Sequence, residues 1–179
     1  MNLLLIGGTR FLGRHLVDSA LARGYSLTLF NRGKSNPGLY PQIETILGDR
    51  ETDLDKLADR RWDAVIDTCG YLPRIVRLSA QALRESVDSY VFISSISAYA
   101  DFAQVGITEN SPLATMPDET VEEITGETYG PLKVLCEKAV EAEFPERALI
   151  IRPGLIVGPH DPTDRFTYWP FRIAGGGEV

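Results

Sequence analysis

The first 34 residues constrain the fold of this chain more than any other stretch. An apolar run at residues 2–6 breaks into a glycine-rich turn at residues 7–13, and a helical pattern of apolar residues follows. Gly24 ends that pattern, and residues 26–30 form a second apolar run. Strand, glycine turn, helix and strand make a βαβ unit, which opens a parallel sheet. In such a unit the glycines let the backbone approach a pyrophosphate, which binds where the free N–H groups of the helix N-terminus point outward.

The spacing of the glycines favours a dinucleotide. Gly7 and Gly13 fit the outer positions of a Gly-x-x-Gly-x-x-Gly motif, while Arg10 occupies the middle position. A glycine pair after a strand is often only a tight turn, but here a strand precedes it and a helix follows it, as nucleotide binding requires. A P-loop is excluded because no Gly-Lys-Ser/Thr closes the glycine run.

The remaining chain continues to alternate strand and helix patterns, which predicts a doubly wound parallel α/β sheet, the Rossmann fold, in three α/β/α layers. The long acidic segment between the fifth strand and the next helix is a candidate functional loop. Further strands are expected at residues 43–47, 62–67, 90–93 and 148–151, and helices at 54–57, after Pro73, at 129–144, and at 166–173 with a kink at Pro170.

Composition and charge exclude several classes of protein. The 179 residues are 44% apolar and 24% charged, which is typical of a globular domain. We find no apolar run that could span a membrane and no signal peptide. Cys69 and Cys136 lack metal-ligand spacing, so we expect two thiols in a cytoplasmic protein without a metal, with a disulfide as the alternative. The net charge of −7, with seven acids and no base in residues 101–127, argues against nucleic acid as a partner.

The end of the second strand bears on cofactor choice. Folds that prefer NAD carry an acid there for the ribose hydroxyls, but this chain has Asn31 and Arg32. A guanidinium suits a ribose 2′-phosphate, so we expect NADP(H) in preference to NAD(H). The alternative is a solvated arginine in a turn.

A candidate catalytic pair lies at the start of the helix expected from residue 129. Tyr129 and Lys133 are four residues apart, so they share one face of the helix. Ser95 and Ser97 follow the fifth strand, at the carboxyl edge where open α/β sheets bind their ligands. A lysine ammonium favours the phenolate of a nearby tyrosine, which would let Tyr129 act as a base.

With these motifs the chain resembles the extended short-chain dehydrogenase/reductase family of epimerases and dehydratases. The resemblance covers the whole chain, and its start and residues 31–33 are also similar to the branch with chloroplast stem-loop RNA-binding proteins and bacterial epimerases or reductases. The motifs, in family order, are Gly7-x-x-Arg10-x-x-Gly13, Gly48-Asp49, Ser94-Ser95-x-Ser97-x-Tyr99, Tyr129-Gly130-x-x-Lys133 and Arg152-Pro153-Gly154-x-x-x-Gly158-Pro159.

The resemblance implies a role for each matching residue. Tyr129 would be the base, Lys133 its partner and a ligand of the ribose, and Ser95 the group that orients the substrate, with Ser97 as the rival. The pyrophosphate would meet the turn, and the other cofactor contacts would come from the ends of later strands. The expected cofactor-binding residues are Gly7, Thr9, Arg10, Phe11, Leu12, Gly13, Asn31, Arg32, Asp49 at the adenine, Arg50, Lys133, and Pro153 near the carboxamide.

The implied activity is NAD(P)-dependent hydride transfer on a nucleotide sugar or a related carbonyl compound. The alternatives are a non-catalytic NAD(P)-binding regulatory or RNA-binding protein, and a purely structural domain. Because the family normally continues into a substrate domain, we expect residues 1–179 to be one dinucleotide-binding domain. Residues 155–179 would begin the largely absent substrate portion. Such a fragment would bind dinucleotide without turnover, and its apolar end at 166–173 suggests self-association as a homodimer.

Overall fold

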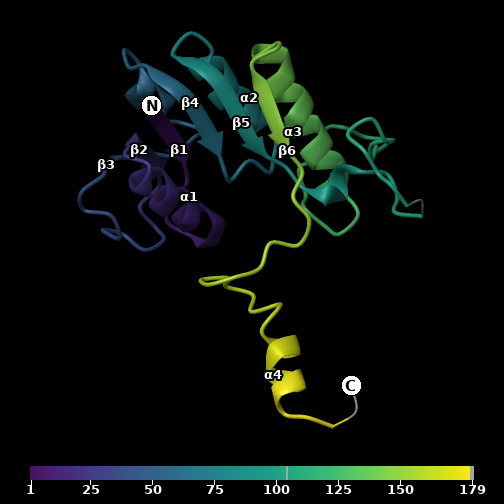
Figure 1. The fold of residues 1–179 in the computed structure, drawn as a ribbon. Helices are drawn as coiled ribbons and strands as arrows, with labels where there is room; N and C mark the ends of the chain where they lie inside the picture. Colours follow the sequence, from purple (N-terminus) through teal and green to yellow (C-terminus); the bar gives the residue numbers. More distant parts are fainter. Residues whose placement is uncertain (104, 178–179) are drawn as a thin grey trace.

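The computed structural model describes residues 1–103 and 105–177, which form a parallel sheet of six strands in the order β3-β2-β1-β4-β5-β6. Helix α1 lies on one face of the sheet, and α2 and α3 pack together on the other (Figure 1). The predicted doubly wound α/β/α architecture is therefore confirmed. The strands are β1 (Asn2–Ile6), β2 (Ser26–Asn31), β3 (Glu44–Leu47), β4 (Trp62–Asp67), β5 (Val87–Ile93) and β6 (Ala148–Ile151); the helices are α1 (Phe11–Ala22), α2 (Pro73–Leu83), α3 (Tyr129–Glu143) and α4 (Tyr168–Ala174), with 3₁₀ turns η1 (Leu54–Leu57) and η2 (Ile96–Ala98).

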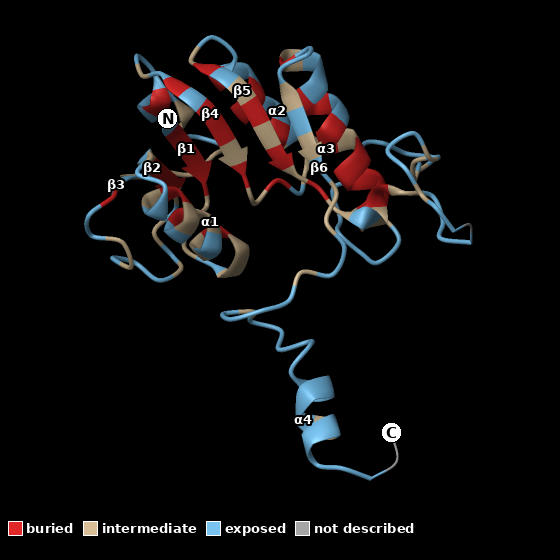
Figure 2. Ribbon diagram, in the orientation of Figure 1, coloured by how far each residue is buried: buried red, intermediate tan, exposed pale blue. Residues whose placement is uncertain are grey.

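The core lies on both faces of the sheet because side chains alternate across it. From β1, Leu4 and Ile6 enter the larger core, which α2 and α3 cover. Leu5 enters a smaller core with Val17 of α1. Figure 2 shows the central strands as the most buried part of the molecule. Burial on both faces explains why β1 is a continuous apolar run rather than an alternating one.

Strand β6 is covered on one face only within the described residues. Ala148 and Ile150 pack against the larger core, whereas Leu149 and Ile151 are 55% and 40% exposed. Because alternate residues face opposite sides, the exposed pair faces the α1 side of the sheet.

The chain leaves the sheet after β6 and ends in α4, which stands apart from the body (Figures 1 and 2). Trp169 and Phe171 of α4 are 50% and 79% exposed. The kink predicted at Pro170 is wrong, because Pro170 lies in the first turn of α4, where proline fits a regular helix. Among the described residues, no helix has both the length and the apolarity to cross a bilayer.

Several boundaries differ from the predicted ones. β3 begins at Glu44, one residue late, and β5 begins at Val87, three residues early. β5 is longer because its backbone pairs with β4 from Trp62↔Val87 onward, whether or not the side chains are apolar. η2 was not predicted; Ser95 caps it by accepting a hydrogen bond from the Ser97 amide.

Candidate active site

The order of the strands places a crevice between the carboxyl ends of β1 and β4. From β1 the chain proceeds outward through β2 and β3, then returns to β4 on the other side of β1. Such a switch point is where open α/β sheets bind ligands. The residues predicted for the site lie on segments that leave this edge of the sheet.

The β1–α1 turn has the shape of an anion cradle. Gly7 and Gly8 adopt φ values of 110° and 95°, which side-chain-bearing residues rarely adopt. A Cβ on Gly13 would lie 2.8 Å from the Gly8 Cα, so glycine is needed for α1 to pack against the turn. Among the described residues no side chain caps α1, whose first turn contains no acid. The uncapped N-terminus of α1 and its positive dipole end therefore suit a phosphate, and the turn fits the predicted pyrophosphate.

Other residues predicted for the phosphate lie around this turn. Thr9 is half-buried, and its carbonyl accepts a hydrogen bond of 2.8 Å from Asn36 Nδ2. Arg10 is exposed, and Phe11 and Leu12 are half-buried at the start of α1. A small hollow of about 100 Å³ beside them includes His160 from the segment after β6. The tail therefore passes beside the predicted phosphate site.

Asn31 and Arg32 are placed differently at the end of β2. The Asn31 amide donates to the Gly7 carbonyl (3.2 Å) and accepts from the Gly33 amide (2.9 Å). Asn31 thus fixes the glycine turn through its side chain. Arg32 is exposed at the same edge.

The structure gives Asp49 and Arg50 contacts that were not predicted. Asp49 is half-buried and accepts from the Glu51 amide (3.1 Å). The Arg50 guanidinium, only 11% exposed, forms two hydrogen bonds to Asp67, of 3.1 and 2.7 Å. Arg50 therefore supports the end of β4, because its guanidinium pairs with a buried carboxylate there. A direct contact with cofactor stays a prediction.

Asp67 is the centre of this network and is fully buried at the end of β4. It also accepts from the Tyr90 hydroxyl (2.9 Å) and from the Cys69 amide (3.1 Å). Burial alone would raise the pKa of Asp67, but Arg50 and these donors together lower the pKa below its usual value. Burial and the charge of Asp67 raise the pKa of Tyr90. A charged Asp67 thus holds the chain that leaves β4.

Lys133 joins the ends of β4 and β5. Its ammonium donates to the carbonyls of Gly70 (2.8 Å) and Ile93 (2.7 Å) and lies 4.3 Å from the centre of the Phe92 ring. Burial lowers the pKa of Lys133, although neighbouring groups such as Asp67 oppose this. The described residues accept from two of the three N–H groups of the ammonium, which leaves one for a ribose hydroxyl or a phenolate.

Tyr129 begins α3 and is half-buried, and a second tyrosine lies near it. The ring centre of Tyr71 is 5.5 Å from Lys133 Nζ. Burial raises the pKa of Tyr71, Tyr129 raises it further, and Arg10 opposes the rise. Tyr71 therefore lies beside the ammonium of the predicted catalytic pair. Sequence reasoning missed it, although its place just after β4, at the switch point, was an available signal.

The two candidate serines contact each other. Ser95 Oγ donates to Ser97 Oγ at 3.2 Å, and both are half-buried. The carbonyl of Pro153 accepts from the Ile96 amide (2.8 Å), which joins the segment after β6 to the serines. The structure thus leaves both hydroxyls as candidates.

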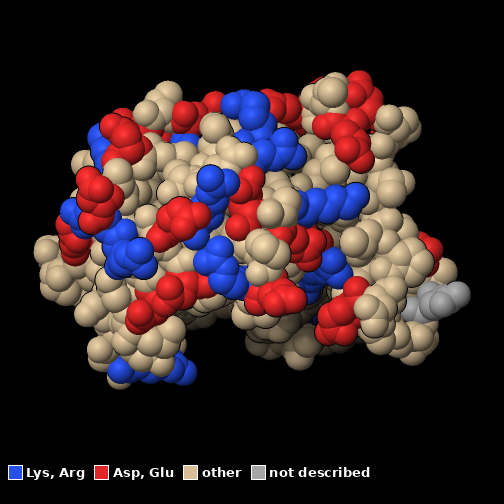
Figure 3. All heavy atoms as spheres, turned by 90° about the horizontal axis from the view of Figure 1, so that it is seen from above, with Lys and Arg blue, Asp and Glu red and all other residues tan. Residues whose placement is uncertain are grey.

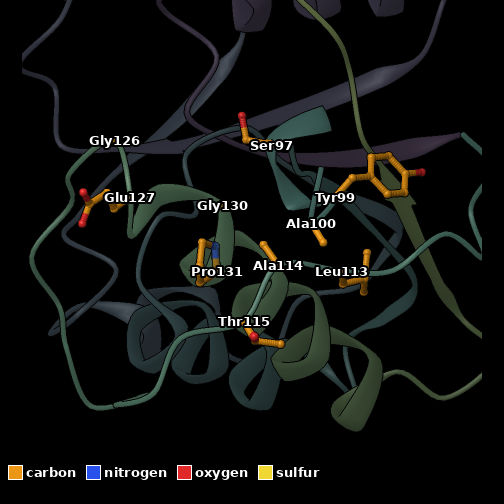
Figure 4. A pocket seen from close by; sticks show the side chains of 10 residues that line it. All are labelled: Ser97, Tyr99, Ala100, Leu113, Ala114, Thr115, Gly126, Glu127, Gly130 and Pro131. Carbon is orange, nitrogen blue, oxygen red and sulfur yellow. The ribbon is translucent and has the colours of Figure 1, made fainter. Parts of the chain in front are cut away.

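A glycine lets α3 approach these serines closely. A Cβ on Gly130 would overlap the carbonyl oxygen of Ser97. Figure 4 shows the pocket beside this contact, of about 400 Å³, which opens next to the start of α3. Its lining residues are Ser97, Tyr99, Ala100, Leu113, Ala114, Thr115, Gly126, Glu127, Gly130 and Pro131.

The strand order and the glycine cradle define the class of this protein as a Rossmann-type α/β protein. Comparison with protein families finds no family model that matches the chain.

Individual proteins do match. The chain is 30% identical over 166 residues to a UDP-glucose 4-epimerase of Neisseria meningitidis serogroup A, covering 76% of this chain and 46% of that protein. It is 29% identical over 180 residues to the decarboxylating sterol-4-alpha-carboxylate 3-dehydrogenase of Bos taurus, covering 88% and 47%. The crystal structure of the Bordetella bronchiseptica enzyme WbmG in complex with NAD and UDP superimposes with a TM-score of 0.72 at 17% identity, covering 100% and 61%.

These relatives confirm the predicted resemblance to the extended short-chain dehydrogenase/reductase enzymes of the epimerase/dehydratase type. The similarity to the chloroplast branch stays a prediction. The chain spans about half the length of these two curated relatives, 46% and 47%.

Proposed function

We propose that this chain carries the nicotinamide dinucleotide site of an epimerase, dehydratase or reductase that acts on a nucleotide sugar or a related hydroxyl compound. The observation that carries the proposal is the convergence at one sheet edge. The Lys133 ammonium donates to a carbonyl in the segment after β4 and to one at the end of β5. These contacts lie beside the switch point, where the glycine turn leads into α1. The Neisseria relative is named a UDP-glucose 4-epimerase, and the WbmG structure contains UDP. Both support a nucleotide sugar as the substrate.

The roles follow from the donors and acceptors at the site. A bound nicotinamide ring would supply hydride chemistry. Tyr129 would accept the proton of the substrate hydroxyl, and Ser95 would donate a hydrogen bond to the same oxygen. Lys133, with one N–H left, would bind the ribose and favour the phenolate.

The charge on one face of the molecule gives no support for nucleic acid as a partner (Figure 3). Figure 3 shows the molecule from above the view of Figure 1, at the amino ends of the strands, where bases and acids are intermingled. Nucleic-acid binding requires a basic face, which this view does not offer.

The direct test is a titration of residues 1–179 with NADH and NADPH, followed by fluorescence. We expect saturable binding of a dinucleotide, because α1 begins without a side-chain cap behind a turn that requires glycines. We expect no substrate-dependent change in absorbance at 340 nm with a panel of UDP-sugars, because the described residues do not enclose a substrate. A longer gene product serves as the comparison. Absence of dinucleotide binding would overturn the proposal, and turnover at the rate of the longer product would show that the site is complete here.

The preference for NADP(H) rests on Arg32 and the missing acid. We expect Arg32→Ala to weaken NADPH binding by about 1–3 kcal/mol, the range for a lost hydrogen bond to a charged group, and to leave NADH binding nearly unchanged. Isothermal titration calorimetry measures both, and Lys34→Ala is the matched control from the same turn. The WbmG structure contains NAD; equal losses for the two cofactors would show that Arg32 does not read the 2′-phosphate.

A further inference from the structure

A buried ion pair outside the predicted catalytic set connects the segments that carry that set. Glu137 lies on α3, two helical turns after Tyr129, and is 2% exposed. Arg152 follows β6 directly, and its guanidinium donates to both carboxylate oxygens, at 3.0 and 2.7 Å. Burying two charges costs free energy of desolvation that their attraction only partly recovers. A bidentate pair does fix orientation, because two parallel hydrogen bonds permit little rotation.

On its inner side the pair holds the serine segment. Ser94 Oγ donates a hydrogen bond to Glu137 Oε1. The Ser94 amide also donates to the Ile151 carbonyl (2.7 Å). Two residues further on, the Ile96 amide donates to the Pro153 carbonyl (2.8 Å). Ser95 is therefore held on both sides by groups tied to Glu137 or to the segment of Arg152.

On its outer side the pair contacts the acidic connection, the segment of residues 101–127 between η2 and α3. Arg152 lies 5.0 Å from the centre of the Tyr99 ring and donates to the Glu109 carbonyl (3.4 Å). Tyr99 also lines the pocket beside α3. One guanidinium thus contacts α3, the chain after η2 and the acidic connection.

We propose that the Glu137–Arg152 pair is a positioning device that sets the Tyr129 phenol on α3 against the Ser95 hydroxyl after β5. The inference rests on the proposed function, in which these two groups share one substrate oxygen. Neither member of the pair is assigned a contact with cofactor or substrate. Its effect on catalysis would be through geometry, where a misplacement of about 1 Å costs about 10²-fold in rate.

Two kinds of variant separate position from stability. Glu137→Gln leaves the guanidinium without its charge partner. The double variant Glu137→Leu/Arg152→Met removes both charges, and such replacements of buried pairs are often neutral or stabilising. The matched control is Glu122→Gln, which breaks an exposed ion pair between Arg74 of α2 and the acidic connection.

The measurement is the tyrosine-ring carbon NMR spectrum of ¹³C-labelled protein, with the Tyr129 signal assigned by its loss in Tyr129→Phe. For both pair variants we expect a shifted or broadened Tyr129 signal, an unchanged Kd for NADH and, in a form with turnover, kcat lower by about 10²-fold at a similar KM. Glu122→Gln should change none of these.

An unchanged Tyr129 signal in the folded double variant would overturn the positioning role. This readout does not depend on turnover, so it also tells the two proposals apart. Absence of dinucleotide binding would refute the proposed function, whatever the spectrum of the pair variants.

Discussion

Replacing Arg50 by methionine is expected to lower the free energy of unfolding by about 3–5 kcal/mol at neutral pH, because it leaves a buried charge without its partner. Asp67 is fully buried, and Arg50 provides two of its hydrogen bonds. Tyr90 and the Cys69 amide would still donate, but they are neutral groups. Urea unfolding followed by circular dichroism measures the loss.

The same variant should respond to pH in a way that surface pairs do not. In the native protein Arg50 and the other donors outweigh burial, and the pKa of Asp67 lies below its unfolded value. Above an unfolded pKa of about 3.9 the pair makes its full contribution to the free energy of unfolding. This contribution is lost as the pH falls through the pKa of Asp67 in the folded protein. Without Arg50, burial raises that pKa, so the deficit of the variant should shrink as the pH falls.

The control is Arg60→Met, which breaks the exposed pair with Glu44 and should change stability little. If Arg50→Met were no less stable than Arg60→Met at neutral pH, the network would not hold the end of β4.

Replacing Tyr129 by phenylalanine is expected to lower turnover by about 10²–10⁴-fold, the usual contribution of a positioned acid–base group, with little change in cofactor affinity. The phenol is assigned only to the proton of the substrate. Lys133→Ala should damage turnover and binding together and also destabilise the protein, because its ammonium satisfies the carbonyls of Gly70 and Ile93. The measurements are single-turnover absorbance at 340 nm in a form with turnover, and NADH fluorescence.

Tyr71→Phe is the matched control for this variant, since Tyr71 lies beside the same ammonium. A larger loss for Tyr71→Phe than for Tyr129→Phe would transfer the role of base to Tyr71. Retention of the full rate by Tyr129→Phe would refute the assignment of the base.

Local sequence determined most of the fold. The apolar run of β1, the glycines of the turn and the apolar face of α1 are short-range signals. Each of them predicts its element without reference to the rest of the chain. The alternation of strands and helices then dictates a parallel sheet, because a crossover helix returns the chain in the same direction. The same local patterns placed Tyr129 and Lys133 on one helical face, since four residues make about one turn.

Only the tertiary structure decided which polar groups meet. Arg50 and Asp67 lie on different elements, and no spacing in the sequence relates them; the return of the chain to β4 buries the carboxylate beside the guanidinium. Glu137 and Arg152 likewise pair only because α3 packs against the end of β6. Partner choice among buried charges depends on desolvation and distance, which are properties of the folded chain, whereas strands, helices and glycine turns follow from steric preferences of each short segment.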